Sequence, residues 1–145
     1  MKKIILLTIG LSLFLNADFS RNTNGVVLDS TTKLEWQDSY LGMDEIYQSN
    51  WYDALLYCEN LVLDGHNDWR LPNINELISL LDHSKFQSKI DASFEYYDDK
   101  NSYDDVFWSS STYITHTHKA WGIGFAHGED RKYVKNKRYF VRCVR

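Results

Sequence analysis

The N-terminal segment carries the longest apolar run of the chain, from Ile4 to Leu15, directly after two lysines. A basic start, an apolar run of about a dozen residues and a small residue such as Ala17 are typical of a secretory signal peptide. A membrane-spanning helix takes about 20 apolar residues, which is more than this run provides. The sequence therefore predicts a signal peptide over residues 1–17, with a retained N-terminal membrane anchor as the alternative.

The remainder of the chain, residues 18–145, contains no second apolar run of that length and no internal repeat. Its length suits a single domain with one core. We expect this domain to be exported, either to the periplasm or out of the cell. After signal cleavage it is expected to hold no integral membrane segment.

Two segments show the pattern of amphipathic helices. Apolar residues recur with a helical period from Trp51 to Val62, and Asn50 is a favourable N-cap for a helix over that range. A second helix is predicted to begin at Ile74, because Asn73 and Glu76 have the spacing of a capping box.

Short alternating segments predict strands before and after these helices. Residues 24–38 predict a β-hairpin at the N-terminal end. Residues 39–48 are expected to form a loop, residues 82–106 a long loop without a sustained period, and residues 127–130 a turn. Three segments predict antiparallel strands at the C-terminal end: 106–115, 120–126 and 138–144. This order of elements predicts an α+β domain.

The chain has two cysteines, Cys58 and Cys143. Cys58 lies in the apolar stripe of the first predicted helix, and Cys143 shares one face of the last predicted strand with Tyr139 and Val141. Two cysteines in an exported chain predict one disulfide, with free or intermolecular thiols as the alternative. A bridge would leave no thiol for nucleophilic catalysis.

Charge is unevenly distributed along the domain. Residues 18–117 hold 18 acidic and 6 basic residues, whereas residues 118–145 hold 2 acidic and 8 basic residues. An exported domain with a net negative charge is a poor candidate for binding nucleic acid, so no nucleic-acid partner is expected. The basic C-terminal quarter suits an anionic partner instead.

Basic and aromatic residues of this C-terminal quarter form the candidate ligand-binding set. Lysine and arginine suit sulfate and carboxylate groups, and tyrosine rings can stack on sugars. The candidate residues are Lys119, Arg131, Lys132, Tyr133, Lys135, Lys137 and Arg138. The alternative is a solvated hairpin whose charges balance the acidic remainder of the chain.

No catalytic or metal-binding motif emerges from the sequence. His116 and His118 would share a strand face, but a third metal ligand is not identifiable. Ser109 to Ser111 do not lie in the Gly-x-Ser-x-Gly context of a serine hydrolase. An acidic set offers oxygen ligands for Ca²⁺, although a solvated loop is the favoured interpretation: Glu95, Asp98, Asp99, Asp104 and Asp105. We therefore expect no catalytic residue, no metal, no cofactor and no enzymatic activity.

Four stretches of the chain resemble the Lcl C-terminal domain family. They are Leu34-Glu35-Trp36-Gln37, Asp68-Trp69-Arg70-Leu71-Pro72-Asn73-Ile74-Asn75-Glu76-Leu77, Ile90-Asp91 and Phe94 with Phe107-Trp108-Ser109-Ser110-Ser111, and Ala120-Trp121-Gly122-Ile123-Gly124-Phe125 with Val141-Arg142-Cys143-Val144-Arg145. The block from Trp69 to Glu76 is the most specific of them. The motif residues expected to be structural are Trp36, Trp69, Arg70, Leu71, Pro72, Glu76, Trp108, Ser109 and Trp121.

This resemblance implies a C-type lectin-like domain that binds rather than catalyses. The family's founding member is a collagen-like bacterial adhesin whose terminal domain resembles a glycosaminoglycan binder. The implied partner is a polyanionic glycan or a cell-surface or envelope protein. The chain lacks a collagen-like Gly-x-y repeat, so trimer formation through such a stalk is not expected. The alternative is a structural or protein-interaction domain of the bacterial envelope with no glycan role.

Overall fold

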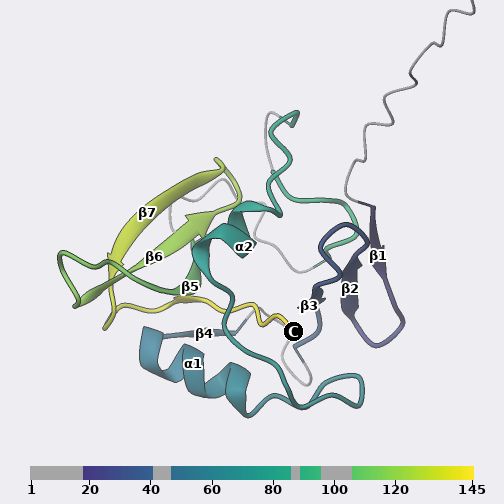
Figure 1. The fold of residues 1–145 in the computed structure, drawn as a ribbon, viewed down its shortest axis with the longest axis horizontal. Helices are drawn as coiled ribbons and strands as arrows, with labels where there is room; N and C mark the ends of the chain where they lie inside the picture. The colour runs from purple at the N-terminus through teal and green to yellow at the C-terminus, as the bar shows by residue number, and fades with distance from the viewer. Residues whose placement is uncertain (1–17, 41–46, 86–88, 96–105) are drawn as a thin grey trace, which may run out of the picture.

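The computed structural model describes residues 18–40, 47–85, 89–95 and 106–145, which form two sheets and two helices (Figure 1). This mixed α/β composition with one disulfide confirms the predicted combination of elements. The predicted signal peptide lies outside the described residues. No helix within the described ranges is long and apolar enough to cross a membrane.

The first sheet has three antiparallel strands in the order β1-β2-β3. They are β1 (Phe19–Arg21), β2 (Val26–Asp29) and β3 (Glu35–Gln37). β2 and β3 form the predicted hairpin, and the Asp29 carboxylate closes its turn by accepting hydrogen bonds from Thr31 N at 2.8 Å and the Thr32 hydroxyl at 2.6 Å. β1 was not predicted, because three residues are too few to show an alternating pattern.

The second sheet has five strands in the order β4-β8-β5-β6-β7. They are β4 (Gln48–Ser49), β5 (Val106–Thr112), β6 (Lys119–Gly124), β7 (Glu129–Val134) and β8 (Tyr139–Phe140). Neighbouring strands are antiparallel, except that β5 and β8 pair in parallel through Phe107 and Phe140.

Two predicted connections differ from the observed ones. The end of the predicted loop over residues 39–48 pairs as β4 with a partner far along the chain, which local sequence does not indicate. The predicted turn over residues 127–130 lies instead at residues 125–128, where Gly128 has a φ of +70° that suits glycine. β7 therefore begins at Glu129, and its exposed polar start lacks the alternation that marks a half-buried strand.

The last predicted strand, over residues 138–144, is a regular ladder only in β8. Beyond β8 the chain stays extended, and Val144 forms isolated bridges with Trp36 on one side and Arg70 on the other. Val141 and Cys143 share the buried face on the α1 side, as predicted, but Phe140, Arg142 and Val144 are buried too, so both faces of the segment are enclosed. The C-terminal segment thus joins the first sheet to the segment that precedes the second helix.

Both helices begin where the capping residues predict. The Asn50 side chain accepts hydrogen bonds from the backbone at the start of α1 (Trp51–Glu59). Asn73 and Glu76 form the predicted capping box at the start of α2 (Ile74–Ile78). α1 ends three residues earlier than predicted, at the C-cap Asn60, whose side-chain amide donates a hydrogen bond of 2.7 Å to the Leu56 carbonyl.

The second sheet separates two apolar clusters. α2 packs on one face, where Leu77 and Leu80 meet Phe107 and Ile123. α1 packs on the other face, where its buried side contacts the cluster around Trp108. In Figure 1 the two helices accordingly lie on opposite sides of β5. Adjacent residues of one strand thus supply both clusters, as the alternating direction of side chains requires.

The predicted disulfide joins Cys58 of α1 to Cys143 of the C-terminal segment, with a Cα–Cα distance of 5.4 Å. Both residues are fully buried in the cluster on the α1 side. On the chain-entropy model, closing a loop across a separation of 85 residues stabilises the fold by about 4–5 kcal/mol.

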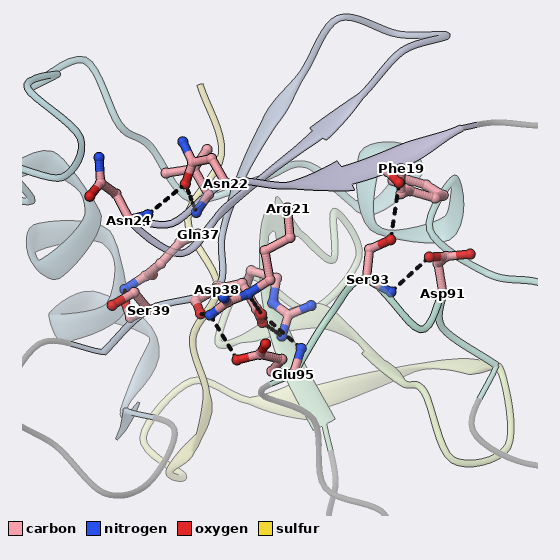
Figure 2. Close-up of polar contacts among 12 residues, drawn as sticks. Phe19, Arg21, Asn22, Asn24, Gln37, Asp38, Ser39, Asp91, Ser93 and Glu95 are labelled. Atoms are coloured by element: carbon pink, nitrogen blue, oxygen red, sulfur yellow. Dashed lines mark hydrogen bonds and ion pairs between the residues drawn. The ribbon is translucent and has the colours of Figure 1, made fainter.

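A buried ion-pair network, shown in part in Figure 2, connects the first sheet to the rest of the domain. The Asp38 carboxylate accepts a hydrogen bond from Arg21 Nε at 3.0 Å, from the backbone N–H of Glu95 at 2.7 Å and from Arg142 at 3.2 Å. Arg142 and Asp38 are both fully buried. The guanidinium of Arg142 also lies 4.5 Å from the centre of the Phe94 ring.

Candidate ligand-binding surface

The candidate basic residues lie on β6, β7 and the turn after β7, and they point to different faces of the sheet. Lys119 and Trp121 share one face of β6, because alternate residues of a strand point the same way. The strand register pairs Trp121 with Lys132 of β7, which places Lys132 on that face as well. Arg131 points to the opposite face and forms an ion pair with Glu129.

Two other members of the candidate set lie against the core. Lys135 is only 7% exposed; its ammonium lies 3.7 Å from the centre of the Trp51 ring and donates a hydrogen bond of 2.8 Å to the Thr112 hydroxyl. Burial lowers the pKa of Lys135 below the ordinary value of lysine. Tyr133 packs edge-on against Trp108 with ring centroids 6.3 Å apart. Both side chains therefore contribute to packing on the face of the sheet that α1 covers.

The last two members lie apart from the first group. Lys137 is exposed in the connection between β7 and β8. Arg138 is exposed too, and its guanidinium donates a hydrogen bond of 2.8 Å to the Gln48 carbonyl, which ties it to β4. The basic cluster of the sequence is thus distributed over several places and does not form one continuous patch.

An exposed group of aromatic rings surrounds Lys132. The Lys132 ammonium lies 4.4 Å from the centre of the Trp121 ring and 5.2 Å from that of Tyr113. Tyr113 meets Trp121 edge-on at a centroid distance of 5.7 Å and stacks on His116 at 5.6 Å. Both Tyr113 and Trp121 are partly exposed, and Lys132 is exposed. We call Tyr113, Trp121 and Lys132 together the Trp121 surface.

Local hydrogen bonds hold the backbone under this surface. In the connection between β5 and β6, Tyr113 N donates to the Lys119 carbonyl at 2.9 Å, and Lys119 N donates to the His116 carbonyl at 2.8 Å. The buried Ser109 hydroxyl donates to the Trp121 carbonyl at 2.7 Å. The Ser109 predicted as a motif residue thus positions the strand that carries the indole ring.

The sequence did not reveal the contribution of Tyr113 to this surface. In the sequence, Trp121 is recognisable as a motif residue and Lys132 as a basic residue, and nothing connects the two. Tyr113 approaches both only because the connection between β5 and β6 folds back, and the spacing of residues carries no such signal. Ile114, also in this connection, is the most exposed large apolar residue among those described, at 85%.

The two histidines considered as metal ligands lie in the same connection, rather than on one face of a strand. The rings of His116 and His118 are 6.0 Å apart and nearly perpendicular, at 77°. Within the described ranges, no group of three or more His, Cys, Asp or Glu residues is arranged to hold a metal ion.

The acidic set is described only at Glu95, since Asp98, Asp99, Asp104 and Asp105 lie outside the described residues. Glu95 forms an ion pair with Arg21 of β1 at 3.0 Å, as Figure 2 shows. Among the described residues, Glu95 therefore pairs with an arginine of the first sheet and not with the basic residues of β7.

The motif residues from Trp69 to Glu76 support the framework of the domain. Trp69 and Leu71 are buried, while the Arg70 guanidinium donates to both carboxylate oxygens of Glu76 at 2.7 and 2.8 Å. These hydrogen bonds lower the pKa of Glu76 below its ordinary value. The Pro72 carbonyl accepts a hydrogen bond of 2.7 Å from the backbone of β5. Trp36 and Trp108 are fully buried as well.

These features define a small disulfide-bridged α/β domain. An aromatic and basic surface lies on the edge strand β7 of its larger sheet and on the neighbouring strand β6. Residues 25–145 match the sequence model of the Lcl C-terminal domain, and the chain belongs to this family, as its motifs predicted. A search among curated proteins finds no significant match.

Proposed function

We propose that this protein is an exported, non-catalytic binding module that recognises acidic saccharides through the Trp121 surface. The observation that carries the proposal is the exposed Lys132 ammonium beside two partly exposed rings, 4.4 Å from that of Trp121 and 5.2 Å from that of Tyr113. Membership of the Lcl C-terminal domain family supports a binding role. With it we propose the lectin-like fold and the periplasmic or extracellular location that the sequence predicts.

The chemistry of an acidic saccharide matches these groups. The apolar face of a sugar ring packs on an aromatic ring, while a carboxylate or sulfate group pairs with an ammonium. An exposed cation–π contact is worth only about 0.5–1 kcal/mol, so the lysine can leave the indole and turn toward an anion. Lys119 lies on the same face and would add a second positive charge.

Retention on a heparin column tests this function. We expect the protein to bind at low salt and to elute as salt rises, because exposed charge pairs are screened. Trp121→Ala and Lys132→Ala are each expected to elute at clearly lower salt. Lys33→Asn removes an exposed charge on the first sheet, at a position whose φ of 65° asparagine tolerates, and serves as the control.

Two results would overturn the proposal. One is flow-through of the wild-type protein at low salt, which would exclude a polyanion as ligand. The other is equal retention of all four proteins, which would place heparin binding elsewhere on the surface. Retention that depends on Lys132 but not on Trp121 would also count against a sugar stacked on the ring.

A further inference from the structure

The outer side of α1 exposes three large apolar side chains on the part of the fold opposite α2. Tyr52, Leu56 and Val62 are 58%, 56% and 63% exposed. Tyr52 and Leu56 are four residues apart and so share one face of the helix. Val62 lies three residues beyond the end of the helix. Scattered apolar residues are common on surfaces, but a contiguous group of them can mark an interaction site.

Two adjoining hollows lie beside Leu56 and Val62, whereas Tyr52 lines neither of them. The first, of about 440 Å³, is lined by Leu56, Tyr57 and Val62 among others, and Tyr47 stacks on Tyr57 at 4.2 Å to form part of its wall. The second, of about 470 Å³, shares Val62 and extends to Asp64. We call this pair of hollows the α1 groove. The apolar side chains of the first hollow can receive a side chain of leucine size from a partner, whereas the second hollow is mainly polar.

Acidic residues predominate around the α1 groove. The ammonium of Lys135 lies 5.9 Å from the centre of the Tyr52 ring, but Lys135 is buried. From Leu34 to Trp69 the chain holds eight acidic residues and no lysine or arginine. Asp53 lines the first hollow and Asp64 the second, while Glu59 lies one turn beyond Leu56. None of these three carboxylates forms an ion pair with a lysine or arginine of the described residues.

One basic residue, Arg21, also lines the second hollow. Its guanidinium is already bonded to Asp38 at 3.0 Å and to Glu95 at 3.0 Å, so its charge is balanced within the fold. The carboxylates of Asp53 and Asp64 accept side-chain hydrogen bonds from asparagine amides, and no lysine or arginine of the described residues pairs with them. The groove therefore complements a cation.

We propose that the α1 groove binds a cationic amphipathic segment of a partner protein. Apolar side chains of that segment would enter between Leu56 and Val62, and its lysines or arginines would pair with Asp53 and Glu59. These carboxylates argue against an anionic membrane surface as the occupant. The groove and the Trp121 surface share no residue, so this site is independent of the saccharide site.

Fluorescence anisotropy with two labelled synthetic peptides tests the site on the full-length protein. One peptide is an amphipathic helix of leucine and lysine, and the other has glutamate in place of every lysine. We expect the lysine peptide to bind in a salt-dependent manner and the glutamate peptide to bind at least about tenfold more weakly. Leu56→Gln and Glu59→Gln are each expected to weaken binding of the lysine peptide severalfold.

Ile114→Gln is the matched control, because it removes an even more exposed apolar side chain on the β5–β6 connection. Trp121→Ala is a second control that disrupts the saccharide site alone. Equal binding of the lysine peptide to Leu56→Gln, Ile114→Gln and wild type would overturn the proposal. Dimerisation of the protein that Leu56→Gln abolishes would overturn it too, because a second copy of the chain would then be the occupant.

Discussion

Lys132 and Lys135 lie three residues apart at the end of β7, and each places its ammonium over a tryptophan ring. Lys132 is exposed and lies 4.4 Å from the ring centre of Trp121. Lys135 is buried, lies 3.7 Å from that of Trp51 and donates a hydrogen bond to Thr112. The same pair of residue types thus forms a surface contact in one place and an internal one in the other.

The difference shows that a cluster of charges in the sequence need not become a cluster on the surface. The side chain of Lys132 follows the alternation of β7, whereas Lys135 follows the strand and packs against the start of α1. A further hydrogen bond joins the two elements, since Trp51 N donates to the Lys135 carbonyl at 2.9 Å. We therefore expect buried cations to affect stability and exposed cations to affect binding.

The most deeply buried cation, Arg142, allows the strongest test of this distinction. Arg142→Met removes the charge opposite the buried Asp38 carboxylate. We expect a loss of about 3–5 kcal/mol in the free energy of unfolding, because a buried charge loses one of its partners. Urea denaturation followed by tryptophan fluorescence measures this change.

The control for Arg142 is Arg138→Met, which removes an exposed guanidinium from the same end of the chain. Its effect on stability is expected to stay within about 0.5–1 kcal/mol. A double variant, Asp38→Leu with Arg142→Met, should recover part of the loss, since it removes both charges. If Arg142→Met proves as stable as Arg138→Met, the buried ion pair stabilises the fold no more than an exposed arginine does. The distinction between buried and exposed cations would then be wrong.

Lys135 is expected to give the next largest effect. Lys135→Met keeps most of the apolar contact with Trp51 but removes the hydrogen bond to Thr112 and the cation–π contact. We expect a loss of about 1–3 kcal/mol in the free energy of unfolding, because the variant loses a hydrogen bond from a charged donor and the cation–π contact. Thermal or urea denaturation checks this value.

Lys132→Met is the matched variant for Lys135→Met. It is expected to change the free energy of unfolding by no more than about 0.5 kcal/mol and to reduce retention on heparin. Lys135→Met, by contrast, should bind heparin like the wild type once folded. The reverse pattern, with Lys135 controlling binding and Lys132 controlling stability, would contradict the division between internal and surface lysines.

Local chemistry explains which parts of the fold could be predicted. Asn50 and Asn73 start their helices with side chains that act within three residues, so the sequence itself contains the signal. Alternation places Val141 and Cys143 on one face, but it does not reveal that the opposite face, with Arg142, is buried as well. β1, β4 and β7 were missed, because each is short or polar and takes its hydrogen bonds from a partner that the local pattern does not identify.

The candidate site was predicted less completely for a related reason. Charge and aromatic content identified Lys132, and the family motif identified Trp121, but their contact depends on the register between β6 and β7. Lys135 was included with Lys132 because both are basic, although its position after the end of β7 turns it inward. The sequence alone therefore does not show which lysine is exposed on the sheet and which is buried against α1. That distinction depends on the fold.

Among the three cations that form ion pairs or hydrogen bonds within the fold and are tested for stability, the half-exposed Arg70 should give the smallest effect. Its guanidinium is 47% exposed and bonds both carboxylate oxygens of Glu76. Glu76→Gln keeps an oxygen that can accept the hydrogen bond from Asn73 N in the capping box, so it tests the ion pair alone. At pH 7 we expect a loss of about 0.5–1 kcal/mol in the free energy of unfolding, as for exposed pairs.

This loss is expected to depend on pH in one direction. Because Arg70 holds the pKa of Glu76 below its ordinary value, the unfolded chain takes up a proton at Glu76 before the folded chain does as the pH falls. The pair therefore stabilises the fold above about pH 4.3, and its contribution disappears as the pH falls through the lowered pKa of the folded state. In urea denaturation, the difference in stability between wild type and Glu76→Gln should therefore shrink as the pH is lowered from 7 through the lowered pKa of Glu76. A difference that stays constant over this range would show that the variant acts through the cap, and that a half-exposed arginine behaves like the exposed Lys132.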